Sequence, residues 1–272
     1  MHGILEPLQY VFIQRALLAS VLVGVSCSFL GVYVVLRRIS NIGHALTHSA
    51  LPGIVIAFMC GANLFLGALI AVLFTALMIG FLSKDDKISE DTATGMMPTI
   101  MFALGVLLIS ASKSYRDMSS MLFGNILGVS NGDLWLIGTI TVVIVLALVL
   151  CHKELQLFCV DRDYAQTIGI NVEGLRLLLL ILLSLSVVTG IQATGAILTN
   201  ALLIVPTAAA RLVVNQLIPL MITAVSMTVA CCIAGVYCSY YFGFSSGASI
   251  VLCCGLCFGI SWLFRAVQNR KR

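Results

Sequence analysis

The chain has 272 residues, of which 60% are hydrophobic and only 10% are charged, with a formal net charge of +4. A soluble domain carries about 25% charged residues, so this composition excludes a soluble fold. It predicts an all-α polytopic membrane protein, because helices satisfy their own backbone groups in lipid. A membrane β-barrel would need short alternating segments, and a nucleic-acid partner would need a basic run with interleaved aromatics; neither pattern occurs.

Eight or nine apolar segments follow one another and predict a single integral-membrane domain over residues 1–272. They lie near 10–36, 44–61, 64–82, 95–112, 134–151, 175–191, 195–210, 216–240 and 247–264. Because a span needs about 20 apolar residues, the shorter segments are expected to be tilted, broken or re-entrant. The stretch 117–133 is too polar to span, and either a re-entrant segment or an outer loop fits it.

Positive charge gathers on alternate connections between these segments. Twelve of the fifteen Lys and Arg side chains share one side if every segment crosses, namely Arg37, Arg38, Lys84, Lys87, Lys153, Arg162, Arg176, Arg211, Arg265, Arg270, Lys271 and Arg272. The positive-inside rule then places the C-terminus in the cytoplasm. Nine crossings put the N-terminus outside, and eight put it inside.

Two of the four histidines, His44 and His48, lie four residues apart in the stretch NIGHALTHSALPG. On a helix this spacing stacks both side chains on one face, and neutral imidazole is a good ligand for transition metals. Pro52 and Gly53 follow and are expected to break or kink the helix. The alternative is a pair of interfacial histidines bonded to backbone carbonyls, since His44 lies only six residues after Arg38.

Two imidazoles are too few for a stable metal site, which takes about four ligands. A second copy of the chain would supply two more across a two-fold axis.

The remaining polar residues suggest simpler roles. Asn200, with Thr194 and Thr199, is expected to mediate helix packing, and Glu90 with Asp91 is expected to form a solvated helix start.

Five blocks of sequence carry a resemblance that the single motifs do not. They are RRISNIGHALTHSALPGIVIAF (37–58), KISEDTATGMMPTIMFALGVLLIS (87–110), MLFGNILGVS (121–130), DRDYAQTIGINVEGLRLLLL (161–180) and ATGAILTNALLIVPTAAARL (193–212). In this order they resemble the membrane-spanning permease subunits of the ABC-type manganese, zinc and iron importers. The resemblance implies a pore subunit of the bacterial cytoplasmic (inner) membrane that passes a divalent ion inward and holds no permanent cofactor.

The resemblance also implies a role for the histidines and a set of partners. His44 and His48 would ligate the metal in the translocation path, although the family usually has aspartate where His44 stands. Imidazole in that place favours iron, zinc or copper over the harder manganese ion. The implied partners are a pair of cytoplasmic ATPase subunits, a second permease subunit, identical or different, and an extracytoplasmic metal-binding protein.

The connection from Asp161 to Ile170 is the expected docking site for the ATPase. The chain has no P-loop motif, so it is not expected to be an enzyme, and ATP hydrolysis must come from a partner. Asp161 and Asp163 would supply rim charges, while the small residues Ala165 and Gly169 would let a partner surface approach. Without the resemblance, an ordinary amphipathic connector would be the favoured interpretation of this stretch.

Two rival functions come from other classes. An intramembrane metalloprotease with an H-x-x-x-H pair would need Glu directly after the first histidine as general base, but that position is Ala45. A gradient-driven metal transporter would need buried carboxylates for ion coupling, whereas almost all of the eleven Asp and Glu residues lie in predicted loops.

Overall fold

The computed structural model describes residues 7–84, 88–112 and 128–270, and these residues form helices without any strand. Within the described part of the chain, nine helical stretches are long and apolar enough to cross a membrane: Val11–Leu36, Asn41–Met59, Leu64–Leu82, Glu90–Ala111, Asn131–Leu150, Val172–Thr194, Ala196–Val213, Leu217–Phe242 and Ser246–Gln268. The prediction of an all-α polytopic protein is confirmed. Most of the stretch 117–133 lies outside the described residues.

The helices follow one another along the chain with short connections. Their order is η1 (Pro7–Gln9), α2 (Val11–Leu36), α3 (Asn41–Ser49), α4 (Leu51–Met59), α5 (Leu64–Leu82), α6 (Glu90–Ser112), α8 (Asn131–Leu150), α9 (His152–Val160), α10 (Arg162–Thr167), α11 (Val172–Thr194), α12 (Ala196–Val213), α13 (Leu217–Phe242) and α14 (Ser246–Arg270).

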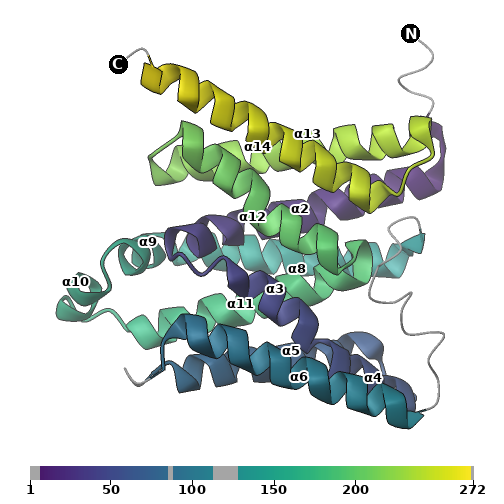
Figure 1. Cartoon of the computed structure of the whole chain (residues 1–272), viewed down its shortest axis with the longest axis horizontal. Helices are drawn as coiled ribbons and strands as arrows, with labels where there is room; N and C mark the ends of the chain where they lie inside the picture. The colour runs from purple at the N-terminus through teal and green to yellow at the C-terminus, as the bar shows by residue number, and fades with distance from the viewer. Residues whose placement is uncertain (1–6, 85–87, 113–127, 271–272) are drawn as a thin grey trace.

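Helices α2 and α11 form the centre of the bundle (Figure 1), and α2 packs against α8, α11, α12 and α13. Polar side chains join these helices across the apolar core. Ser26 Oγ on α2 lies 3.2 Å from Ser186 Oγ on α11, and Ser28 on α2 is hydrogen-bonded to Thr228 on α13. Such interhelical hydrogen bonds are the usual polar contacts between helices in lipid.

Glycine allows the closest helix contacts. A Cβ atom on Gly53 of α4 would lie 2.0 Å from the carbonyl oxygen of Gly67 on α5. A Cβ atom on Gly31 of α2 would lie equally close, 2.0 Å, to the carbonyl oxygen of Leu203 on α12. The backbones therefore touch at both crossings, which small residues permit in membrane helices.

The second candidate span is interrupted, as Pro52 and Gly53 predict. Helix α3 ends at Ser49, and α4 begins at Leu51 with Pro52 in its first turn. Proline is tolerated there because the backbone N–H that it lacks would have no acceptor within the helix. The two short helices share the span Asn41–Met59. The histidines lie on the first of them, α3.

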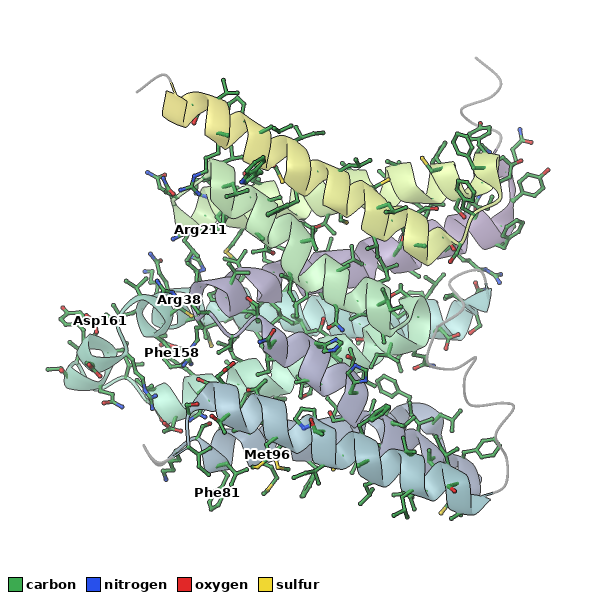
Figure 2. All side chains as sticks on the ribbon, viewed as in Figure 1. Arg38, Phe81, Met96, Phe158, Asp161 and Arg211 are labelled. Atoms are coloured by element: carbon green, nitrogen blue, oxygen red, sulfur yellow. The ribbon has the colours of Figure 1, made fainter. Side chains whose placement is uncertain are left out.

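The cationic connections share one end of the bundle. Figure 2 shows Arg38, Asp161 and Arg211 at the left end, where α14 also finishes (Figure 1) and where α10 forms the outermost element. Helix α2 starts at the opposite end. Arg38 and Arg211 lie on one side, as expected. Lys87, Lys271 and Arg272 lie outside the described residues, and which side is cytoplasmic stays a prediction.

Candidate metal site

A cavity of about 530 Å³ lies alongside the contact between α3 and α6. Helix α3 lines it with Asn41, His44, Ala45 and His48, and α6 lines it with Asp91, Thr94, Gly95, Pro98, Thr99 and Phe102. On both helices these positions recur every three or four residues, so each helix presents one face to the cavity. The structure thus brings both predicted imidazoles to an open cavity between two candidate spans, with polar and apolar side chains on its wall.

The two imidazole rings meet through their outer nitrogens. His44 Nε2 lies 3.2 Å from His48 Nε2, and the ring centroids are 4.5 Å apart at 83°. Two nitrogens that each lie about 2.1 Å from one metal ion, at tetrahedral to octahedral angles, are about 3.0–3.4 Å apart. The observed separation therefore suits two adjacent ligands of one ion.

Neighbouring side chains hold the two rings in place. The His48 ring packs edge-on against Phe102 of α6, with 5.4 Å between the centroids. Thr47 donates a hydrogen bond from Oγ1 to the carbonyl oxygen of His44 at 2.7 Å. Both histidines are exposed to the cavity in this chain, so an ion can reach them.

Asn200 on α12 contacts His44, a contact that sequence reasoning missed. Its Nδ2 lies 3.5 Å from His44 Nδ1 and donates to Thr47 Oγ1 at 3.2 Å. The expected interhelical hydrogen bonding is present, but it reaches the histidine helix. Thr194 and Thr199 instead bond to each other at 3.3 Å. An amide in an apolar span was the only signal in the sequence.

One copy of the chain does not complete a metal site. Within the described ranges, no group of three or more His, Cys, Asp and Glu side chains could hold an ion. Asp91 lines the same cavity from the first turn of α6, but it does not join the imidazoles in such a group. Among the His, Cys, Asp and Glu side chains that the structure describes, an ion here would thus have the two imidazoles as its ligands.

Helix α10 forms the core of the expected docking segment. Asp161 caps it, accepting a hydrogen bond from the Tyr164 N–H at 2.9 Å. Ala165 is fully buried, so it packs α10 onto this chain and does not face outward. Asp163 and Gly169 are exposed, and Gly169 ends the segment with a φ of 84°, a conformation that suits glycine.

A cluster of ion pairs links α10 to the membrane helices. Arg162 pairs with Glu173 at 2.9 Å, and Glu173 lies 3.7 Å from Arg176. The buried Arg176 side chain also lies 3.6 Å from Glu90 and is hydrogen-bonded to Ser83. Glu90 is therefore an internal partner of a buried arginine, whereas sequence reasoning expected a solvated helix start.

Arg37 closes this cluster at the end of α2. It pairs with Glu90 at 3.2 Å, and its guanidinium carbon lies 4.2 Å from the ring centroid of Phe158 on α9. Burial lowers the pKa of Arg37, and the Glu90 carboxylate opposes that shift. The cluster thus joins α2, α6, α9, α10 and α11 at the end of the bundle where α10 lies.

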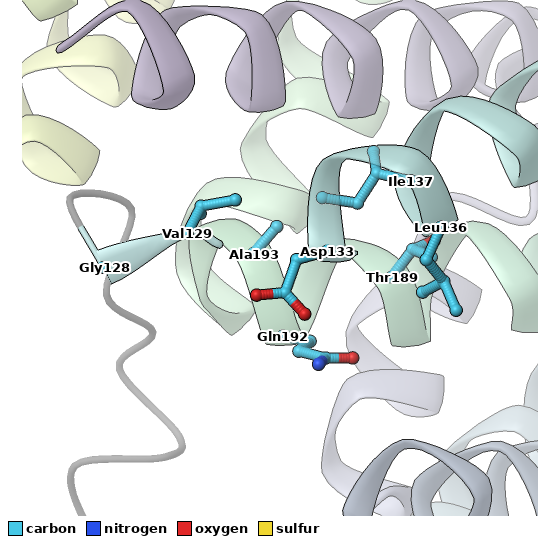
Figure 3. A pocket seen from close by; sticks show the side chains of 8 residues that line it. All are labelled: Gly128, Val129, Asp133, Leu136, Ile137, Thr189, Gln192 and Ala193. Carbon is cyan, nitrogen blue, oxygen red and sulfur yellow. The ribbon is translucent and has the colours of Figure 1, made fainter. Parts of the chain in front are cut away.

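A second, smaller cavity of about 180 Å³ lies between α8 and α11 (Figure 3). Figure 3 shows Asp133 and Gln192 on its wall. The Asp133 carboxylate already accepts hydrogen bonds from the Ser130 N–H at 3.0 Å and from the Ser130 hydroxyl at 2.8 Å. It completes the capping box of α8, so this cavity offers no free ligand set comparable with the α3–α6 cavity.

Ionisable side chains that face a cavity between membrane spans are typical of ion pathways, so the fold and the site indicate the transport class of membrane proteins. Residues 9–265 match the model of the ABC 3 transport family, and the chain belongs to this family. It is 40% identical to the manganese transport system membrane protein MntC of Halalkalibacterium halodurans, over 97% of this chain and 91% of that relative. It is 35% identical to the chelated iron transport system membrane protein YfeD of Yersinia pestis, over 98% and 90% of the two chains.

A solved structure shares the fold. PsaBC from Streptococcus pneumoniae in complex with Fab superposes with a TM-score of 0.85 and 33% sequence identity, covering 96% of this chain and 95% of that one. The family membership rules out the enzyme class among the rival functions, and it agrees with the missing general base at Ala45.

Proposed function

We propose that this chain is the permease subunit of an ATP-binding-cassette importer for manganese or iron ions, and that residues 1–272 act as one membrane domain. The family and the named relatives support the transport class and the kind of cargo. The observation that carries the site is the 3.2 Å separation of His44 Nε2 and His48 Nε2 in a cavity within a span. The ion is cargo, so the two imidazoles hold it only briefly.

The ligand types bear on which ion is preferred. Imidazole suits iron and zinc, whereas carboxylate and water oxygens suit manganese. The resemblance implies that the family usually has aspartate where His44 stands, so a site built on His44 would carry less negative charge. We expect iron to bind at least as well as manganese, with a second permease subunit, identical or different, supplying the remaining ligands across the pore axis.

The energy for import comes from ATPase subunits at the end of the bundle that carries α10. Asp161, Asp163, Gly169 and the exposed Tyr164 are accessible there. Asp161 also caps α10, whereas Ala165 is buried against this chain. ATP binding would draw the two docking segments together, and this movement would change the side of the membrane to which the cavity opens. The C-terminus shares this end and would be cytoplasmic, in the bacterial inner membrane, while an extracytoplasmic protein delivers the ion opposite.

Uptake by the reconstituted complex tests this function. Vesicles that hold the permease and its ATPase should take up manganese or iron only with ATP, and the ion should stimulate ATP hydrolysis. Parallel competition among manganese, iron and zinc would rank the cargo ions. Uptake that proceeds without ATPase, driven by an ion gradient, would refute the proposal.

A further inference from the structure

Behind His44 lies a carboxamide from a distant part of the chain. Asn200, 156 residues further along, places Nδ2 3.5 Å from His44 Nδ1 and 3.2 Å from Thr47 Oγ1. Its Oδ1 is buried and has no hydrogen-bond partner. A buried amide oxygen without a partner is rare in folded proteins and calls for an explanation.

Close packing keeps this amide against α3. A Cβ atom on Gly43 would lie 2.5 Å from Leu203 Cδ2 and 3.0 Å from Asn200 Oδ1. Helices α3 and α12 therefore touch at Gly43, one residue before His44. The amide has little room to move away from the imidazole, although it can turn about its own side-chain bond.

The two ring nitrogens of His44 have different neighbours. Nε2 faces His48, and Nδ1 faces Asn200. A histidine that ligates a metal through one nitrogen usually makes a hydrogen bond through the other, which fixes the tautomer and the ring orientation. We infer that Asn200 is a positioning residue for His44, holding its imidazole so that Nε2 points at an ion shared with His48.

The amide of Asn200 has a donor end and an acceptor end. Nδ2 is the end nearest His44 Nδ1, and Oδ1 is the acceptor end, buried and without a hydrogen-bond partner. A ring that ligates an ion through Nε2 needs an acceptor for its Nδ1–H, and a half-turn of the amide would present Oδ1 there.

This inference rests on the proposed metal site, so its test includes that site. The probe is Co²⁺, titrated into the full-length permease assembled with its ATPase subunits and followed by its visible absorption. Asn200→Leu removes both ends of the amide and should weaken Co²⁺ binding by about 10- to 100-fold. Asn200→Asp keeps an acceptor for the Nδ1–H and should bind Co²⁺ at least as tightly as the unmodified protein.

Thr207→Val is the matched control, because Thr207 is buried two turns along α12 and bonds only to the Leu203 carbonyl of its own helix, at 3.4 Å. It should bind Co²⁺ normally. Normal binding by Asn200→Leu, or equal weakening in the Leu and Asp variants, would overturn the positioning role. If Asn200→Leu fails to assemble, Asn200→Asp decides alone: weaker binding than the unmodified protein refutes the role. Normal binding by His44→Ala would instead refute the metal site itself.

Discussion

Helix α6 borders two regions that differ in their polar groups: in one the charges are paired within the chain, and in the other the polar side chains face a cavity. At its first residue, Glu90 forms ion pairs with Arg37 and with the buried Arg176, so these charges are paired within the chain. Further along, the face from Asp91 to Phe102 borders the cavity, where His44 and His48 bond mainly to each other. Buried charges that are paired internally serve the fold, whereas polar groups left facing a cavity in a membrane indicate transport.

The largest effect should come from the cavity histidines. We expect His44→Ala or His48→Ala to reduce ATP-dependent uptake by more than the about 100-fold loss typical of an outer-shell change. The thermal unfolding temperature in detergent should stay nearly constant, because both imidazoles and the contact between them are exposed to the cavity. Changes at exposed side chains usually alter stability by only about 0.5 kcal/mol. Normal uptake by both variants would place the ion path elsewhere.

Substitutions in the ion-pair cluster should mainly change the stability of the fold, whereas the histidine variants should mainly change uptake. Arg176→Met removes a buried cation and leaves Glu90 and Glu173 without it, which should destabilise the fold by about 3–5 kcal/mol. Arg162→Met is the matched control, because Arg162 is 42% exposed and its ion pair contributes about 0–1 kcal/mol. Thermal unfolding of the purified protein measures both. Equal losses in the two variants would contradict the distinction between buried and exposed pairs.

Glycine substitutions offer a third contrast, between the close contact of α4 with α5 and the open cavity face of α6. Gly53→Ala places a methyl group against the Gly67 backbone and should cost about 1–3 kcal/mol through overpacking. Gly95→Ala lies on the cavity face of α6 with no atom within 4 Å of the new Cβ. It should stabilise the helix by about 0.5–1 kcal/mol. Unfolding temperatures that change in the same direction would show that the α4–α5 contact can relax.

The smallest effect concerns Cys159, which lies on α9 beside the ion-pair cluster. Burial raises the pKa of its thiol from 9.0 to about 12, although Arg37 opposes the shift. The thiol stays neutral at pH 8, so maleimide should label it far more slowly than the exposed Cys60. Because the folded-state pKa is raised, ionisation of this thiol does not change the stability of the fold below about pH 9. The fold loses stability as the pH rises from about 9 to about 12. Mass spectrometry of single-cysteine proteins measures the labelling rates.

Much of the architecture follows from local patterns. The apolar runs predict the candidate spans because each must satisfy its backbone within itself. The spacing of His44 and His48 predicts a shared face, and Pro52 predicts the break between α3 and α4, since both depend on helix geometry within a few residues. The docking segment was located by resemblance, and its role remains a prediction.

Other features could not be read from neighbouring residues. Glu90 looked solvated because Lys84 and Lys87 precede it, yet its partners are Arg37 and Arg176 from two other helices. Ala165 looked like part of a surface but is fully buried. The approach of Asn200 to His44 depends on the contact between α3 and α12 at Gly43.

The amino-acid sequence by itself determined a helical membrane protein with two stacked imidazoles, because hydrophobicity and helix periodicity act over one turn to one span. Only the tertiary structure decided which charges are enclosed, which histidine nitrogen faces His48, and which amide lies behind it. Those outcomes depend on how helices far apart in the chain cross and pack, and no local pattern encodes that.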